Sequence, residues 1–350
     1  MKRFIIAILL VAVLLAATAC SKKARTLYVF NWSDYIDPEL VTQFEKEHNC
    51  KVKIPTYDSN ENMFAKIEST RESFDIAVPS GDHVTLLAQK GYLEPLDKTK
   101  LTHWGNLDPK LLEKAKSFDP GNQYAVPYFW GLTGLLYNKK NVPEEVLKSG
   151  SWAILGDKHF SGKQKISMLE DAREVVGAAL VYKGYNINDS SPEALKAASE
   201  ALAIWDQNVS QYDSESYKNE VADGTTWLGQ AYNGDALQQM ELNKDLGFLL
   251  PVEGTSLWMD SMVILKSSQN KDLAYDFINY MLESETAKTN ADYVKYATPN
   301  AEATKLLDPA FTGNPLIYPS AEYLDKCYMI EFLGDKVKAI NDLFEQIRMN

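Results

Sequence analysis

The stretch that follows the apolar N-terminus alternates between short apolar runs and amphipathic segments, and this alternation constrains the fold most strongly. Residues 27–30, 51–54 and 74–78 are apolar or alternating runs typical of strands. Residues 37–49 and 60–71 between them have the pattern of helices, and the first begins with an aspartate N-cap followed by proline. Strand, helix, strand, helix, strand implies parallel pairing with right-handed crossovers, so we predict an α/β fold.

Two loops follow these predicted strands at the edge of the sheet where ligands bind. In open α/β sheets, a ligand lies just beyond the carboxyl ends of the strands. The first loop carries Trp32, Ser33, Asp34 and Tyr35, and the second carries Ser80 and Asp82. We therefore expect both loops to line a binding site. A turn in which Asp34 bonds its own backbone is the simpler explanation of the first loop.

Later segments indicate a chain that passes between two lobes. Residues 128–137 are predicted to cross between the lobes as an extended strand, and 257–265 to return to the first lobe as another. The segments 192–205, 272–282 and 335–348 are amphipathic and predict helices. A chain of 350 residues is long enough for two lobes, each with its own core.

Two further stretches gather carboxylates near aromatic rings. Asp171 and Glu174 are i, i+3 neighbours at a predicted helix start, with Trp227 and Tyr232 downstream as candidate ring partners. Trp258 and Asp260 are two residues apart in a predicted strand, so both project to one face. A capping box would explain the first pair equally well, and a core tryptophan beside a strand-end aspartate would explain the second.

Rings and carboxylates together favour an organic cation as ligand. An ammonium 4 Å from a carboxylate gains roughly 4 kcal/mol at an effective dielectric of 20, before desolvation is subtracted. Each well-placed ring adds about 0.5 to 2 kcal/mol. An anion would need arginines, and of those in the chain only Arg173 lies in a candidate site. The net charge of −12 also disfavours nucleic acid as a partner.

Enzyme motifs are weak in this sequence. The histidines His48, His83, His103 and His159 are scattered, without paired-ligand spacing, and are interpreted as lone surface or core residues. Residues 156–163 have one residue too many for a phosphate loop, and Gln164 replaces the Ser or Thr that such a loop requires. We expect no catalysis, no metal and no cofactor. A glycosidase that uses two of the carboxylates stays open as an alternative.

The N-terminus has the pattern of a secretory signal with a lipidation site. Two basic residues precede an apolar run at 4–15, and small residues then lead to Cys20. We predict a signal peptide at 1–19, lipidation of Cys20 and a polar tether at 20–25. Ala17 stands where a leucine is usual, so an ordinary cleaved signal is the alternative. Cys50 and Cys327 remain, too few for a disulfide framework.

Several motifs together resemble the spermidine/putrescine-binding proteins of bacterial ABC importers. They are Phe30–Tyr35, Tyr57–Glu61, Val78–Ser80, Val126–Gly131, Asp171–Val175, Trp258–Ser261 and Ala297–Asn300. The resemblance implies a type II periplasmic binding protein fold with two hinged lobes, each with a central, mostly parallel sheet. It places residues 26–133 and 257–301 in lobe 1, and residues 134–256 and 302–350 in lobe 2.

The resemblance also implies roles for individual residues. Trp32, Tyr35 and Tyr296 would be aromatic walls, Ser33 a hydrogen-bonding neighbour, Trp258 a flank for the methylene chain, and Asp260 a partner for an amine. Asp171 and Glu174 would hold the other amine. Asp82 and Tyr232 depart from the spermidine-preferring pattern, so the choice between putrescine and spermidine stays open.

The function implied is that of a monomeric, lipid-anchored periplasmic receptor. It would capture a polyamine between its lobes and deliver it to the permease and ATPase subunits of an ABC transporter. A surface lipoprotein that binds a host macromolecule is the alternative from a different functional class.

Overall fold

The structure is a computed structural model that describes residues 25–69 and 74–349. The strands are β1 (Arg25–Trp32), β2 (Cys50–Lys53), β3 (Thr56–Tyr57), β4 (Ile76–Ala77), β5 (Ala125–Asn138), β6 (Ile166–Met168), β7 (Val209–Tyr212), β8 (Leu228–Tyr232), β9 (Leu246–Leu249), β10 (Ser256–Ile264) and β11 (Tyr328–Met329). The first helices are α2 (Pro38–His48), α3 (Asn60–Ser69), α4 (Gly81–Gln89), α5 (Pro109–Ala115), α6 (Glu144–Leu147), α7 (Ala172–Tyr182) and α8 (Pro192–Trp205). The later helices are α9 (Tyr217–Asp223), α10 (Asn233–Leu242), α11 (Lys271–Leu282), α12 (Ser284–Val294), α13 (Ala301–Thr304), α14 (Pro309–Thr312), α15 (Ala321–Leu324) and α16 (Val337–Arg348).

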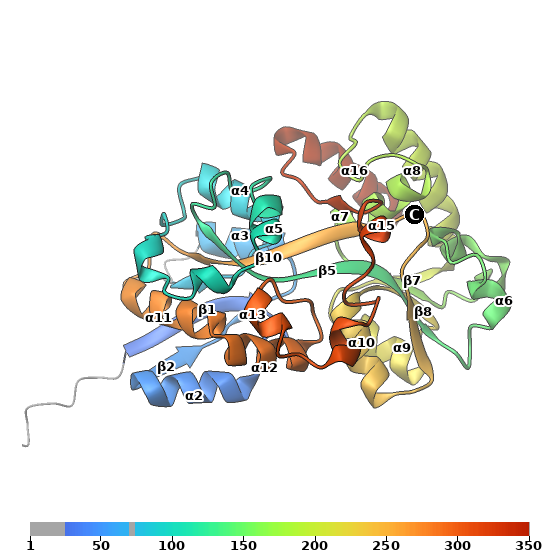
Figure 1. Ribbon diagram of the computed structural model, residues 1–350. Helices are drawn as coiled ribbons and strands as arrows, with labels where there is room; N and C mark the ends of the chain where they lie inside the picture. The colour runs from blue at the N-terminus through green and yellow to red at the C-terminus, as the bar shows by residue number, and fades with distance from the viewer. Residues whose placement is uncertain (1–24, 70–73, 350) are drawn as a thin grey trace, which may run out of the picture.

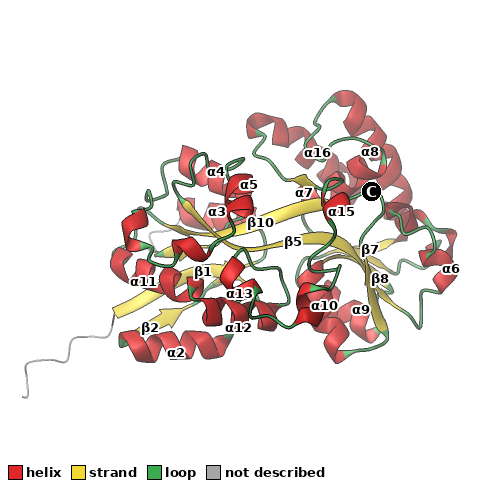
Figure 2. Ribbon diagram, viewed as in Figure 1, coloured by secondary structure: helices red, strands yellow, loops and turns green. Residues whose placement is uncertain are grey.

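The strands form one mixed sheet covered by helices, which confirms the predicted α/β class (Figure 2). Its order is β2-β1-β4-β10-β5-β8-β6-β7, with β3 beside β1, β11 beside β10 and β9 beside β5. At one end β1 pairs in parallel with β2, β3 and β4, and at the other end β6 pairs in parallel with β7 and β8. Antiparallel pairs made by β10 and β5 join the two ends.

The long strands β5 and β10 run along the middle of the molecule (Figure 1). The first part of β5, up to Leu132, pairs with β10, and the second part, from Thr133, pairs with β8 and β9. The extended strand predicted at 128–137 is therefore present within β5. The strand predicted at 257–265 is present as β10, which also pairs with β4.

The apolar core divides where β5 changes partners. One cluster of buried residues includes Leu27, Leu132 and Ile264, and a second includes Leu135, Trp152 and the C-terminal helix α16. Leu307, Phe311 and Ile317 pack in the first cluster, although the predicted boundary at 301 assigns them to the second lobe.

Local signals in the sequence account for the helix ends. The Asp37 side chain accepts a hydrogen bond from the Glu39 N–H at 2.8 Å and caps α2, which ends at Asn49 in the left-handed region at φ 45°. Helix α8 has the predicted bounds of 192–205. The strand predicted at 74–78 is shorter in the structure and covers only Ile76–Ala77.

The predicted signal peptide, Cys20 and the tether up to Ala24 lie outside the described residues. Within the ranges 25–69 and 74–349, we find no helix that combines the length and apolar character needed to cross a membrane. Cys50 and Cys327 are both free thiols.

Candidate functional site

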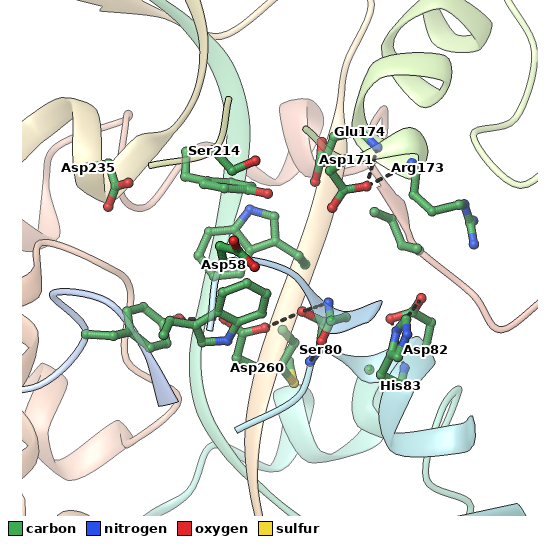
Figure 3. Close-up of a pocket in the computed structure, with 18 of the residues that line it drawn as sticks. Asp58, Ser80, Asp82, His83, Asp171, Arg173, Glu174, Ser214, Asp235 and Asp260 are labelled. Carbon is green, nitrogen blue, oxygen red and sulfur yellow. Dashed lines mark hydrogen bonds and ion pairs between the residues drawn. The ribbon is translucent and has the colours of Figure 1, made fainter. Parts of the chain in front are cut away.

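A cleft is lined by residues from both ends of the sheet, among them Trp32 and Ser80 near β1 and β4, and Asp171 and Tyr232 near β6 and β8. Its carboxylates are Asp58, Glu61, Asp82, Asp171, Glu174, Glu215, Asp235 and Asp260. Its rings are Trp32, Tyr35, Tyr232, Trp258 and Tyr296, and its basic side chains are His83, Arg173 and Lys218. In Figure 3, Asp171 and Glu174 face Ser80, Asp82 and Asp260 across the open space. The predicted carboxylates thus converge from distant parts of the chain.

Asp260 forms the first acidic pole of the cleft. Its carboxylate accepts hydrogen bonds from Ser80 Oγ at 2.6 Å and from Tyr35 Oη at 2.8 Å, and the residue is only 6% exposed. The β10–β5 register shifts between Asp260 and Ser261, an irregularity of the kind that re-aims a side chain. Burial raises the pKa of Asp260 to about 7, against the opposing effect of the two hydrogen bonds. This carboxylate is therefore short of a cationic partner.

Asp171 and Glu174 form the second acidic pole, at the start of α7. Asp171 caps the helix by accepting hydrogen bonds from the backbone N–H groups of Arg173 and Glu174 at 2.8 and 3.1 Å. Glu174 does not complete a capping box, because its carboxylate accepts instead from Ser256 Oγ at 2.7 Å. Burial, followed by the negative charge of Asp171, raises the pKa of Glu174. Helix capping thus explains Asp171 but leaves the position of Glu174 in the cleft unexplained.

A chain of aromatic rings runs along the cleft. Ring centroids are 5.8 Å apart for Tyr232 and Trp258, 5.1 Å for Trp258 and Tyr296, and 5.4 Å for Tyr296 and Tyr35. Trp32 is fixed by a hydrogen bond from its indole N–H to the Val78 carbonyl at 2.9 Å. Such a wall suits a methylene chain and the faces of ammonium groups.

Two glycines make room for this wall. A Cβ on Gly131 would lie 2.4 Å from the Trp258 ring, and one on Gly234 would lie 2.5 Å from the Tyr296 ring. Both distances are far shorter than any non-bonded contact between carbon atoms. The two rings can therefore lie where they do only because Gly131 and Gly234 have no side chain.

Asp82 lines the cleft but already has a partner within the protein. His83 Nδ1 lies 3.1 Å from Asp82 Oδ2, and both side chains are 12% exposed. Burial would raise the pKa of Asp82, but the positive charge of His83 holds it below the usual value. His83 therefore has a carboxylate partner on the cleft wall, which the spacing of the histidines in the sequence did not indicate.

The structure places two other residues differently from the sequence-based hypothesis. Asp34 is not among the lining residues, since its backbone adopts a left-handed φ of 52° and its carboxylate pairs with Lys218 at 3.2 Å. Its side chain is 66% exposed at the edge of the cleft. Trp227 lies away from Asp171 and Glu174, beside His159 and under the Lys163 ammonium.

Sequence reasoning missed several charged lining residues, among them Asp58, Glu61, Glu215, Asp235 and Lys218. Asp235 lies in the first turn of α10, directly after β8. A carboxylate beyond the end of a strand was the signal that could have found it. No comparable signal marks Lys218, because α9 only reaches the cleft through tertiary packing.

Comparison with known proteins gives the family. The profile of bacterial extracellular solute-binding proteins matches residues 39–319. This chain belongs to that family. The spermidine/putrescine-binding periplasmic protein of Escherichia coli is 37% identical to this solute-binding protein over 300 residues, which are 85% of this chain and 84% of that protein.

Two solved structures share the fold of this solute-binding protein. The spermidine/putrescine ABC transporter substrate-binding protein of Streptococcus pneumoniae has a TM-score of 0.80 at 36% identity, covering 93% of this chain and 99% of that one. A lipoprotein of Treponema pallidum has a TM-score of 0.82 at 28% identity, covering 93% and 100%. The resemblance drawn from the sequence motifs is confirmed, and these relatives are solute-binding proteins rather than enzymes.

Proposed function

We propose that this solute-binding protein captures a polyamine in the cleft and delivers it to the permease of an ABC transporter. The observation that carries the proposal is the pair of buried acidic poles, Asp260 and the Asp171–Glu174 pair, joined by a wall of aromatic rings. Asp260 and Glu174 are 6% and 3% exposed, and neither forms a salt bridge within the described residues, so the burial of each carboxylate is unfavourable until a ligand cation binds. The relatives named for spermidine and putrescine binding support this choice of cargo.

The proposed ligand contacts come from both sides of the cleft. Asp260, Trp258, Tyr35 and Tyr296 would hold one amine and part of the chain, and Asp171, Glu174 and Tyr232 would hold the other end. Trp32, Ser33, Ser80 and Asp82 complete the proposed wall. Asp34 would act only through its ion pair with Lys218 at the rim.

The lobes that we propose are 26–133 with 257–301, and 134–256 with 302–350, with one refinement. Because Leu307, Phe311 and Ile317 pack in the first core, we place the last crossing after Ile317. A ligand that touches both lobes would favour the closed arrangement, since only differential contact shifts such an equilibrium.

A ligand panel tests the function. Putrescine, spermidine and cadaverine should raise the melting temperature of the purified protein, because a ligand that binds only the folded state stabilises it. Sugars, amino acids and chromogenic glycosides should neither stabilise the protein nor be turned over. Small-angle scattering with and without the stabilising ligand would report lobe closure. A panel in which no polyamine shifts the melting temperature would refute the proposal.

We also propose that Cys20 is lipidated and tethers the receptor, as a monomer, to a bacterial membrane. The sequence pattern at 1–20 and the lipoprotein among its structural relatives support this. Cys20→Ser should move the protein from the membrane fraction to the aqueous fraction in detergent partitioning, because one or more acyl chains supply roughly 0.8 kcal/mol per buried CH₂. Equal partitioning of the variant and the parent protein would contradict the proposed lipid anchor. The polyamine affinity should be the same in both proteins.

A further inference from the structure

Asp235 forms a third acidic pole in the cleft, and Lys218 of the protein itself pairs with it. Lys218 Nζ lies 3.6 Å from Asp235 Oδ2 and 3.2 Å from Asp34 Oδ2. The Lys218 side chain is only 12% exposed, so its ammonium group is largely withdrawn from solvent. Both Lys218 and Asp235 line the cleft.

The surroundings of Asp235 repeat the chemistry of the Asp260 pole. Asp235 accepts hydrogen bonds from Tyr217 Oη and Tyr296 Oη, each at 2.9 Å, as Asp260 accepts one from Tyr35 Oη at 2.8 Å. The Asp235 side chain is 16% exposed. Tyr296 also contacts the Trp258 ring, so the aromatic wall continues to this pole. The carboxylate and the rings at this end of the cleft would therefore suit a ligand ammonium just as well as those at the other two poles.

The positive charge of Lys218 opposes the binding of a ligand ammonium at Asp235. Burial would lower the pKa of Lys218, but the carboxylates of Asp235 and Asp34 raise it, so the side chain stays charged. A ligand ammonium at Asp235 would meet this positive charge at close range, with little solvent to screen it. The other acidic residues near this end, Asp58 and Glu215, are exposed to solvent.

We propose that Lys218 is a resident counter-cation that closes the Asp235 end of the cleft, so that the site selects diamines against triamines. This inference rests on the proposed function, because it assigns a ligand class to the same site. A diamine needs only the two poles at Asp260 and at Asp171–Glu174. The third ammonium of a triamine finds its matching carboxylate already neutralised.

Lys218→Met tests the proposal by calorimetric titration with putrescine and spermidine. Removing the resident charge frees Asp235 for a ligand ammonium, so the ratio of the putrescine Kd to the spermidine Kd should rise at least tenfold. Lys218→Arg keeps the charge and should leave the ratio within about threefold of the parent value. Lys271→Met is the matched control, because Lys271 pairs with Glu94 at 2.7 Å outside the cleft and is 35% exposed.

The outcomes separate this inference from the proposed function. If the parent protein binds neither polyamine, the proposed function fails. If the parent binds both but Lys218→Met leaves the ratio unchanged, or weakens both ligands equally, Lys218 is only an ion pair between α9 and the Asp34 loop. Should the variant not fold, a crystal structure of the parent protein with spermidine decides. Lys218 still within about 4 Å of Asp235 supports the proposal, and a ligand nitrogen in its place overturns it.

Discussion

Replacing Asp260 with asparagine should weaken polyamine binding at least tenfold, which is about 1.4 kcal/mol. The amide has nearly the shape of the carboxylate, but its single oxygen can accept only one of the two hydrogen bonds that Ser80 and Tyr35 now donate to separate carboxylate oxygens, so the substitution removes the charge and one hydrogen bond. A buried carboxylate interacts strongly with an ammonium because little water screens the pair. Isothermal titration calorimetry of putrescine and spermidine at pH 8, where the parent carboxylate is ionised, measures the loss.

Asp119→Asn is the matched control for this experiment. Asp119 is also buried, at 2% exposed, but it accepts hydrogen bonds from the backbone N–H groups of Tyr124 and Ala125 outside the cleft. Its replacement should lower the melting temperature without changing the Kd. An unchanged Kd in Asp260→Asn, with both variants folded by circular dichroism, would take Asp260 out of the binding site.

Polyamine affinity should fall at least about tenfold for each pH unit as the pH drops from 7 to 5. Burial raises the pKa of Asp260 to about 7 in the ligand-free protein, so at lower pH this carboxyl is mostly protonated and neutral. An ammonium ligand stays charged throughout this range, since amines of this type titrate near 10. Binding must therefore release a proton from the protein below pH 7, and the cost of that release grows as the pH falls.

Calorimetry in two buffers with different ionisation enthalpies counts the released protons. At pH 6 we expect the parent protein to release close to one proton from Asp260, with a further contribution from Glu174, whose pKa burial and Asp171 also raise. Asp260→Asn should show a flatter pH dependence than the parent. A Kd that is constant from pH 5 to pH 8 in the parent protein would contradict this linkage.

Local patterns in the sequence were sufficient to predict those helices and strands whose limits depend on neighbouring residues. The cap at Asp37, the stop at Asn49 and the bounds of α8 follow from side chains within a turn of the site. The strands at 128–137 and 257–265 were also recognisable, because their apolar runs are long.

The acidic poles were only partly predictable. The sequence suggested Asp171, Glu174 and Asp260, since each lies next to a strand end or a ring. It also suggested Asp34, which the structure turns to the rim through a left-handed backbone and an ion pair with Lys218. Aspartate can adopt this backbone conformation for local reasons, but the lysine that its carboxylate meets lies 184 positions away, so the residues around Asp34 do not determine its partner.

The sequence by itself determined the α/β class, the family and the types of side chain available for a cation, because these depend on periodicity and on short motifs. Only the tertiary structure decided which carboxylates are free for a ligand. Tyr35 bonds Asp260 across 225 positions in the chain, Ser256 bonds Glu174 across 82, and Lys218 reaches Asp34 across 184. Partners this far apart meet only when the sheet and its helices have packed. The charge that remains unpaired in the cleft is therefore a property of the fold.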